Sequence, residues 1–393
     1  MNEKEKIFKR GILGTYIIGS VPSYQLLDSI CNNKEEVFIF VDFNNNIKGL
    51  YYPEMLELVL QEISSNNGVF PSILINEWMI MQNYFEEYAR LRNIKKFHVV
   101  YFSEGGQSYY HKNLYKDYKK GRTSAVFALP PSVTNNYKSY EDIQDLIRGF
   151  LVSSWKWIEI LSRKANILSI RLENLDADFI PELLLRKFDI YNDNATYLIL
   201  SSDGDMLQTL DIADNVYIYD SNTNSIITDK NWTNSKRYFD PNKKKANGSE
   251  VLQENHIIED LSPDKVILFK ALVGDSSDHI PGIKGIGVKT FFNSFIQIIP
   301  NDVRCDDIDA ILNICEQRKS DNKVCKKVVS NIEEFTKMIK LVSFKMVIEW
   351  LQQNIQRYSV IKKIIDENYN ALKGSCNLHG LQSMSQADKM LNS

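Results

Sequence analysis

The chain has 393 residues, of which 44% are hydrophobic and 25% are charged. This composition is typical of folded proteins, so it excludes wholesale disorder and provides enough apolar residues for two or three structural units. There are 47 Lys and Arg against 50 Asp and Glu, a net charge of −3, which neither indicates nor excludes a nucleic-acid partner because the distribution of charge matters more than its sum. The longest uncharged run near the start, 11–27, is shorter than the ~20 apolar residues of a membrane span. The five cysteines form no C-x-x-C pair, which favours free thiols in a reducing compartment.

Strand-like and helix-like patterns alternate through the first half of the chain. Short apolar runs predict strands at 37–41, 97–102, 167–172, 197–200 and 216–219. Apolar residues at helical spacing predict helices between them at 76–91, 141–161 and 178–188. Alternating strands and helices predict an α/β fold with a mainly parallel central sheet flanked by helices.

Beyond about residue 250 the pattern is mostly helical, with helices expected at 264–272, 289–298, 308–318 and over much of 331–369. We therefore expect four parts of the chain: an N-terminal extension of unassigned role at 1–36, an α/β core at 37–248, a helical region at 249–372 and a polar tail at 373–393.

Carboxylates follow four of the predicted strands: Asp42, Glu104, the pair Asp176 and Asp178, and the pair Asp203 and Asp205. Because the carboxyl ends of parallel strands share one edge of a sheet, these side chains are expected to converge. Convergent carboxylates repel one another unless a cation neutralises them, and oxygen ligands suit Mg²⁺ or Mn²⁺ rather than zinc. Any one of them could instead be a solvated loop acid or a helix N-cap. Four strand ends in succession favour a divalent-metal site.

A glycine-rich segment, GDSSDHIPGIKGIGVKT at 274–290, carries further acids and cations. Asp275 and Asp278 are three residues apart and would face the same way on a helical turn. Glycines allow backbone amides to approach a phosphate closely, at the positive end of the helix that follows. These glycines and their polar neighbours are Gly282, Lys284, Gly285, Gly287, Lys289 and Thr290. A helix C-cap followed by an ordinary turn is the alternative interpretation of the glycines alone.

A basic segment with interleaved tyrosines precedes the middle of the chain. Its cations are Lys112, Lys116, Lys119, Lys120 and Arg122, and Tyr115 is one of four tyrosines between 109 and 118. Cations can follow a phosphate backbone, and aromatic rings offer faces on which bases stack. The alternative is a solvated helix face, but the nearby acids favour nucleic-acid binding.

These motifs resemble those of the structure-specific 5′ nuclease superfamily, which includes flap endonucleases, the 5′-exonuclease domain of bacterial DNA polymerase I, and bacteriophage-type 5′ exonucleases and ribonuclease H. The segment 274–290 resembles the helix–three-turn–helix of the family, and LYKDYKKGR at 114–122 resembles its helical arch. SSDGD at 201–205 and LDAD at 175–178 are similar to the family motifs S-x-D-x-D and E-A-D-D. The resemblance covers about 37–300. It implies a PIN-like core, an arch near 105–138 and a helix–three-turn–helix at 264–298.

The resemblance also implies site roles. It assigns two Mg²⁺ or Mn²⁺ ions to Asp42, Glu104, Asp176, Asp178, Asp203, Asp205, Asp275 and Asp278. It assigns catalytic contacts with the phosphate to Lys116, Lys119 and Arg122, and nucleic-acid contacts to Lys112, Tyr115, Lys120 and the glycine-rich segment. A monovalent cation, K⁺, is expected on the main-chain carbonyls of Ile283 and Ile286.

Two positions depart from the family pattern. The expected aspartate after the second strand is Glu104, or Ser103 if the register shifts by one residue, and the last aspartate of E-A-D-D is Phe179. Either change could tune or weaken one metal site.

The sequence thus predicts a metal-dependent 5′→3′ exonuclease or flap endonuclease that acts on duplexes, flaps or RNA–DNA hybrids and removes RNA primers in DNA replication. We expect a monomer without a membrane span in the cytoplasm of a bacterial or phage-infected cell, with a single-strand binding protein or a sliding clamp as partners implied by the resemblance. Two alternatives stay open: a fork- or flap-binding protein that has lost catalysis, and a compact PIN-like ribonuclease for single-stranded RNA.

Overall fold

The computed structural model describes residues 21–43, 59–60, 62, 72–106, 108–120, 140–165, 167–188, 190–221, 223–232, 261–354, 356–357, 359 and 361–363. Six strands form one sheet in the order β3-β2-β1-β4-β5-β6. All neighbours are parallel except the last pair, which is antiparallel. The strands are β1 (Glu36–Asp42), β2 (Lys96–Gly105), β3 (Leu168–Glu173), β4 (Ala195–Leu200), β5 (Val216–Asp220) and β6 (Ser225–Ile227).

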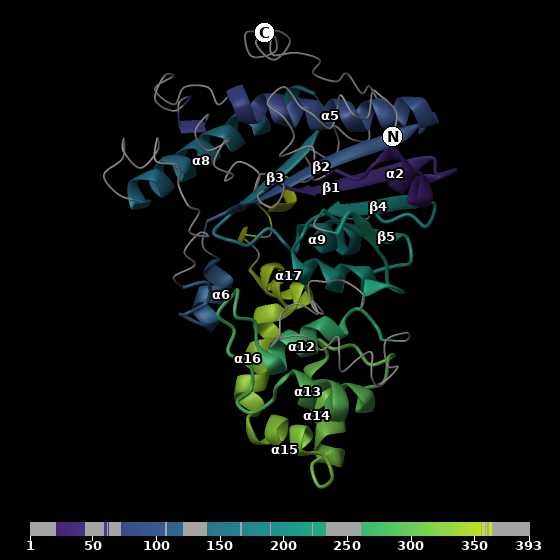
Figure 1. Cartoon of the computed structure of the whole chain (residues 1–393). Helices are drawn as coiled ribbons and strands as arrows, with labels where there is room; N and C mark the ends of the chain where they lie inside the picture. The colour runs from purple at the N-terminus through teal and green to yellow at the C-terminus, as the bar shows by residue number, and fades with distance from the viewer. Residues whose placement is uncertain are drawn as a thin grey trace.

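Helices cover both faces of this sheet (Figure 1). In the first part of the chain they are α2 (Tyr24–Cys31), α5 (Ser72–Arg92), α6 (Tyr109–Leu114), α8 (Tyr140–Lys164), α9 (Ile180–Lys187) and the 3₁₀-helix η3 (Gly204–Asp211). From residue 261 they are α12 (Lys265–Val273), α13 (Val288–Thr290), the π-helix η5 (Phe291–Phe295), the 3₁₀-helix η6 (Ile296–Ile298), α14 (Ile308–Arg318), α15 (Lys323–Ser330), α16 (Ile332–Val342) and α17 (Phe344–Gln353). None of the helices in the described ranges is long and apolar enough to cross a membrane.

The sheet divides the interior into two cores because successive side chains of a strand point to opposite faces. In β1, Val37, Ile39 and Val41 pack with α2, α5 and α8 on one face. Phe38 and Phe40 pack on the other face, in a core that continues through α9 and η3 into the helical region. Burial on both faces explains why β1 is a continuous apolar run rather than an alternating one.

The predicted α/β class and the helical C-terminal region are confirmed, and each of the five predicted strands is present. The helical stretch predicted at 289–298 is present, but it is not one regular α-helix: a short α-turn, a π-helix and a 3₁₀ turn follow one another over 288–298. Phe291, Phe292 and Phe295 are all buried in this stretch and pack into the same core. The boundary predicted near 248 and the tail at 373–393 lie outside the described residues.

Candidate active site

Seven aspartates gather at the carboxyl ends of the parallel strands and at the end of α12. Asp42 closes β1, Asp176 and Asp178 follow β3, and Asp203 and Asp205 follow β4. Asp275 and Asp278 reach the same place from the turn after α12. The acids interact electrostatically as one cluster. Besides desolvation, the pKa of Asp178 is raised by the charges of Asp203, Asp42 and Asp176. The pKa of Asp205 is raised, besides desolvation, by the charges of Asp203, Asp278 and Asp275. The topology therefore brings together acids that are separated by more than two hundred residues in sequence.

Hydrogen bonds hold the first part of this cluster in place. The Ser201 hydroxyl donates to Asp42 Oδ2 at 2.8 Å, and the Asp203 amide donates to the Ser201 hydroxyl oxygen at 3.1 Å. Asp203 also caps η3, accepting from the Asp205 amide at 3.0 Å. The SSDGD motif thus orients its own aspartates and the aspartate of the neighbouring strand.

Crowding and partial burial shift the pKa values of these carboxyl groups in opposite directions. Desolvation, followed by the charge of Asp203, raises the pKa of Asp178 well above its usual range. Desolvation also raises the pKa of Asp205 to about 7, although Lys270 opposes it. Desolvation would raise the pKa of Asp275 too, but the Lys270 ammonium outweighs it and lowers that pKa to about 2. Desolvation therefore dominates at Asp178 and Asp205, whereas the Lys270 ammonium outweighs it at Asp275.

The segment after α6 reaches into the cluster through two adjacent side chains. Lys119 Nζ lies 3.0 Å from Asp176 Oδ1, and the Lys119 amide donates to the Asp278 carbonyl at 3.0 Å. The Tyr118 hydroxyl lies 3.0 Å from Asp176 Oδ2 and 3.3 Å from Asp278 Oδ2. Lys119 has a left-handed backbone, with φ at +50°, which is uncommon for a residue other than glycine. This backbone turns the lysine inward.

Three residues in contact with the acids were not predicted from the sequence. Lys270 of α12 is buried and forms ion pairs with Asp205 and with Asp275, the latter at 2.7 Å. His111 Nδ1 lies 2.9 Å from Asp176 Oδ2, and Tyr118 contacts the same carboxylate. The sequence does hold a signal for Lys270, because a lysine inside the apolar helix KVILFKALV needs a buried partner.

The other cations of the basic segment lie away from the acids. Lys116 and Lys120 are exposed, and Lys120 pairs with Asp117 at 2.8 Å. Lys112 Nζ lies 3.4 Å from the Lys116 carbonyl oxygen. The ring of Tyr115 faces the ammonium of Lys337 at 4.9 Å. Arg122 and the rest of the predicted arch up to 138 lie outside the described residues.

The two departures from the family motifs have different surroundings. Glu104 is exposed near the end of β2, and Ser103 before it is buried. Phe179 is buried in the core as the residue that precedes α9. An apolar ring therefore fills the place of the last aspartate in the E-A-D-D motif.

The glycine-rich segment is a tight turn with a packed side and an exposed side. Asp275 and Ile280 exchange two backbone hydrogen bonds of 2.8 Å, and the Ile283 amide donates to the Leu272 carbonyl at 2.8 Å. Gly282 is buried at φ +66°, where a Cβ atom would lie 2.6 Å from the Gly274 nitrogen. The side chains of Ile283 and Ile286 are buried. The exposed positions are Lys284, Gly285, Gly287 and Lys289, and Thr290 is half-buried.

The donor chemistry of the cluster fits a hard divalent cation, because every predicted ligand is a carboxylate. Within the described ranges, no three carboxylate, imidazole or thiol groups already converge on one ion position. The ammonium groups of Lys119 and Lys270 partly neutralise the acids instead. The crowded carboxylates whose pKa values are raised, Asp178 and Asp205, are those that a bound cation would relieve most.

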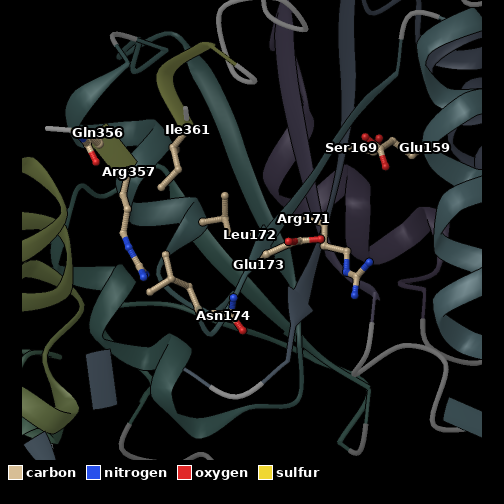
Figure 2. Close-up of a pocket in the computed structure, with 10 residues that line it drawn as sticks. Glu159, Ser169, Arg171, Leu172, Glu173, Asn174, Gln356, Arg357 and Ile361 are labelled. Carbon is tan, nitrogen blue, oxygen red and sulfur yellow. The ribbon is translucent and has the colours of Figure 1, made fainter. Parts of the chain in front are cut away.

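A pocket of about 530 Å³ adjoins the cluster at the β3 edge of the sheet. Figure 2 shows Arg357 and Asn174 at one end and Ser169 and Glu159 at the other, with Leu172 between them. Asn174 and Leu175 line the pocket and lead directly to Asp176. The pocket is therefore a neighbouring space beside the acids and not the acid cluster itself.

Comparisons with known proteins agree with this geometry. No family model matches the chain. It is 29% identical over 211 residues to the 5′-3′ exonuclease of Buchnera aphidicola, covering 54% of this chain and 55% of that protein. It is 23% identical over 273 residues to DNA polymerase I of Bacillus subtilis, covering 70% of this chain and 24% of that protein. The chain is a relative of the 5′-3′ exonucleases. It spans about half the length of the curated exonucleases that it matches.

Solved structures show the same fold. The bacteriophage T5 5′-exonuclease with bound zinc ions aligns with a TM-score of 0.52 and 16% identity, covering 86% of this chain and all of that one. A T5 flap endonuclease in a pseudo-enzyme–product complex with DNA and metal ions also aligns with a TM-score of 0.52, at 15% identity and the same coverage. The resemblance predicted from the motifs is thus confirmed in sequence and in fold.

Proposed function

We propose that this protein is a divalent-metal-dependent 5′ nuclease that hydrolyses phosphodiester bonds near the 5′ ends of duplex, flap or RNA–DNA hybrid substrates. One observation carries the proposal: aspartates from four separate segments converge between the basic segment after α6 and the glycine-rich turn after α12. A site with this charge pattern suits the binding of phosphate through bridging cations. The names of the relatives and structural neighbours support the same activity.

We assign two Mg²⁺ or Mn²⁺ ions to the acids. Asp42, Glu104, Asp176 and Asp178 would hold one, with Glu104 the most exposed of them, and Asp203, Asp205, Asp275 and Asp278 would hold the second. When bound, such ions supply an activated water and stabilise the leaving 3′ oxygen. Because the ions would activate the water, hydrolysis would not require a histidine as general base.

The side chains of the protein have separate tasks in this proposal. Lys119 would stabilise negative charge on the scissile phosphate, because its ammonium already lies at the edge of the cluster. Tyr118 would hold the neighbouring carboxylates of Asp176 and Asp278 in position. Lys270 would fix Asp205 and Asp275 relative to each other. Lys116 is less suited to a catalytic role than Lys119, because it is exposed and its backbone carbonyl accepts from Lys112.

The two flanking segments would bind the nucleic acid. Exposed lysines and glycine amides of the turn would contact duplex phosphates, with Lys284, Gly285, Gly287, Lys289 and Thr290 in this role. Lys112, Tyr115 and Lys120 would contact the strand near its 5′ end. We further propose that the protein removes RNA primers as an intracellular monomer during replication. A single-strand binding protein or a sliding clamp would be its partners.

One alternative function follows from a specific observation. The buried Phe179 and the exposed Glu104 leave two family metal positions changed, so the same fold could bind forks or flaps without cleaving them. The remaining seven aspartates and their lysine partners favour the enzyme.

A cleavage assay on three substrates separates these functions. A 5′-labelled flap duplex, an RNA–DNA hybrid and a plain single-stranded RNA would be incubated with Mg²⁺ or with chelator. We expect Mg²⁺-dependent release of short 5′ products from the first two, abolished in Asp203→Ala/Asp205→Ala. The matched control is Asp193→Ala/Asp214→Ala, because these exposed acids precede β4 and β5 at the opposite end of the same strands. Tight binding without cleavage would favour the binding protein, and cleavage of plain RNA alone would favour a PIN-like ribonuclease.

A further inference from the structure

A lysine from a distant helix lies on the exposed side of the glycine-rich turn. Lys327 Nζ of α15 lies 2.6 Å from the Gly285 carbonyl oxygen and 3.4 Å from the Lys284 carbonyl oxygen. Gly285 has φ at +79°, and a Cβ atom there would lie 2.3 Å from Lys327 Nζ. The missing side chain of Gly285 therefore makes room for the ammonium.

Helix α15 is well anchored, so this contact does not depend on a loose side chain alone. Its N-cap Asn322 accepts from the amides of Val324 and Cys325. Val324, Cys325 and Val328 are buried against the core. The side-chain amide of Asn322 also donates to the Ser294 carbonyl in the π-helix that follows the turn. Lys327 is thus held at a defined distance from the turn.

This arrangement does not fit the free K⁺ ion that the family resemblance implies. The Ile283 carbonyl accepts from the Ile286 amide at 3.0 Å, within the turn itself. The next two carbonyls along the chain, those of Lys284 and Gly285, face the Lys327 ammonium. A second cation at this place would meet like charge at short range, which is unfavourable.

We propose that Lys327 is a built-in counter-ion of the turn, so that the turn needs no monovalent cation from solution. An ammonium has three N–H donors, and two of them are engaged by the Gly285 and Lys284 carbonyls. In the part of the chain that the structure describes, the third donor has no protein acceptor and remains for a phosphate oxygen. This last point rests on the proposed binding of duplex by the turn, whereas the replacement of K⁺ does not.

The melting temperature of the DNA-free protein tests the replacement directly. The full chain would be melted at equal ionic strength in KCl, NaCl or tetramethylammonium chloride. Tetramethylammonium is too large to bind among the backbone carbonyls, whereas K⁺ is small enough. We expect the same melting temperature in all three salts, because Lys327 already occupies these carbonyls and no cation from solution is needed. Lys327→Ala frees the carbonyls, so it should melt lower in tetramethylammonium and recover by ~2 °C in KCl, as expected when a ligand binds only the folded state.

Lys326→Ala is the matched control, because Lys326 is the exposed neighbour on the same helix and carries the same charge. Its melting temperature should not depend on the cation. A wild-type protein that is stabilised by K⁺ relative to tetramethylammonium would overturn the proposal. A Lys327→Ala variant without any cation dependence would overturn it as well.

Duplex binding tests the phosphate contact. Fluorescence anisotropy in chelator would compare Kd in KCl and tetramethylammonium chloride. The Kd in tetramethylammonium chloride divided by the Kd in KCl should stay near one for wild type and Lys326→Ala. For Lys327→Ala this ratio should rise to about five. If Lys327→Ala binds duplex no more weakly than Lys326→Ala in both salts, the phosphate contact is wrong. If wild type binds no duplex at all, the proposed function fails, while the melting experiment still decides whether Lys327 replaces the ion.

Discussion

The basic segment at 109–120 and the glycine-rich turn at 274–290 both adjoin the acid cluster, but they place their positive charges differently. In the basic segment a left-handed backbone turns Lys119 inward to Asp176, while Lys116 and Lys120 remain exposed. In the turn Gly282 lies on the packed side, the lysines of the turn stay outside, and an additional ammonium arrives from α15. A count of lysines therefore identifies a surface that suits phosphates, but backbone geometry decides which lysine reaches the reacting centre.

The sharpest test of this comparison separates Lys119 from Lys116. Lys119→Ala removes the ammonium that lies 3.0 Å from Asp176 Oδ1. We expect single-turnover cleavage of a 5′-flap substrate to fall about 10²–10³-fold, as is typical when one electrostatic stabiliser is removed. Lys116→Ala should change the rate only a few-fold. Equal losses of cleavage rate in the two variants would show that the contact between Lys119 and Asp176 does not contribute to catalysis.

The second test concerns the packed side of the turn. Gly282→Ala places a Cβ atom 2.6 Å from backbone atoms of residues 273 and 274, at φ +66°. The clash and the left-handed backbone should lower the free energy of unfolding by about 3 kcal/mol. Gly287→Ala is the control, because a Cβ atom there meets nothing within 4 Å. Chemical denaturation measures both, and similar stability of the two variants would contradict the packing described for Gly282.

A third test changes stability on the face of the sheet away from both segments. Glu77 of α5 is buried, and burial raises its pKa from 4.5 to about 7. Between pH 4.5 and about 7 the folded protein therefore keeps a proton on Glu77 that the unfolded chain releases. The free energy of unfolding falls as the pH rises through this range. Glu77→Gln removes this dependence and should raise the free energy of unfolding by about 2 kcal/mol at about pH 8, with little change near about pH 4.

Denaturation at several pH values measures this effect, with the exposed Glu334→Gln as control. Cleavage by Glu77→Gln should equal that of wild type, because the change lies outside both charged segments. A stability gain that is independent of pH would mean that Glu77 does not titrate in this range.

The smallest effects concern the exposed lysines of the two segments. Lys284→Ala/Lys289→Ala should weaken duplex binding by about three- to tenfold and lower the salt dependence of log Kd by about one per lysine. Cleavage at saturating substrate should not change. Lys112→Ala/Lys120→Ala makes the corresponding change in the basic segment. If only the turn variant alters the salt dependence, the duplex contacts the turn and not the outer face of the basic segment.

Much of the fold follows from sequence pattern because parallel strands are buried on both faces and therefore appear as continuous apolar runs. The run VFIFV in β1 is an example. The antiparallel edge strand β6 has only three residues, too few for a pattern. Helix α15 is not among the predicted helices, although Val324, Cys325 and Val328 have helical spacing, because eight residues make only a short pattern. The helical stretch expected at 289–298 is present, but its spacing does not show that it combines an α-turn, a π-helix and a 3₁₀ turn.

The sequence alone determined the chemical types at the site and their order along the chain, because SSDGD, LDAD and the glycine-rich segment each carry their geometry within a few residues. Tertiary structure alone decided the partners between segments. Lys270 meets Asp205, Tyr118 meets Asp278, and Lys327 meets Gly285 across separations that no local pattern encodes. The reason is physical: spacing within a helix or turn fixes near neighbours, whereas contacts between distant segments depend on how the sheet and helices pack.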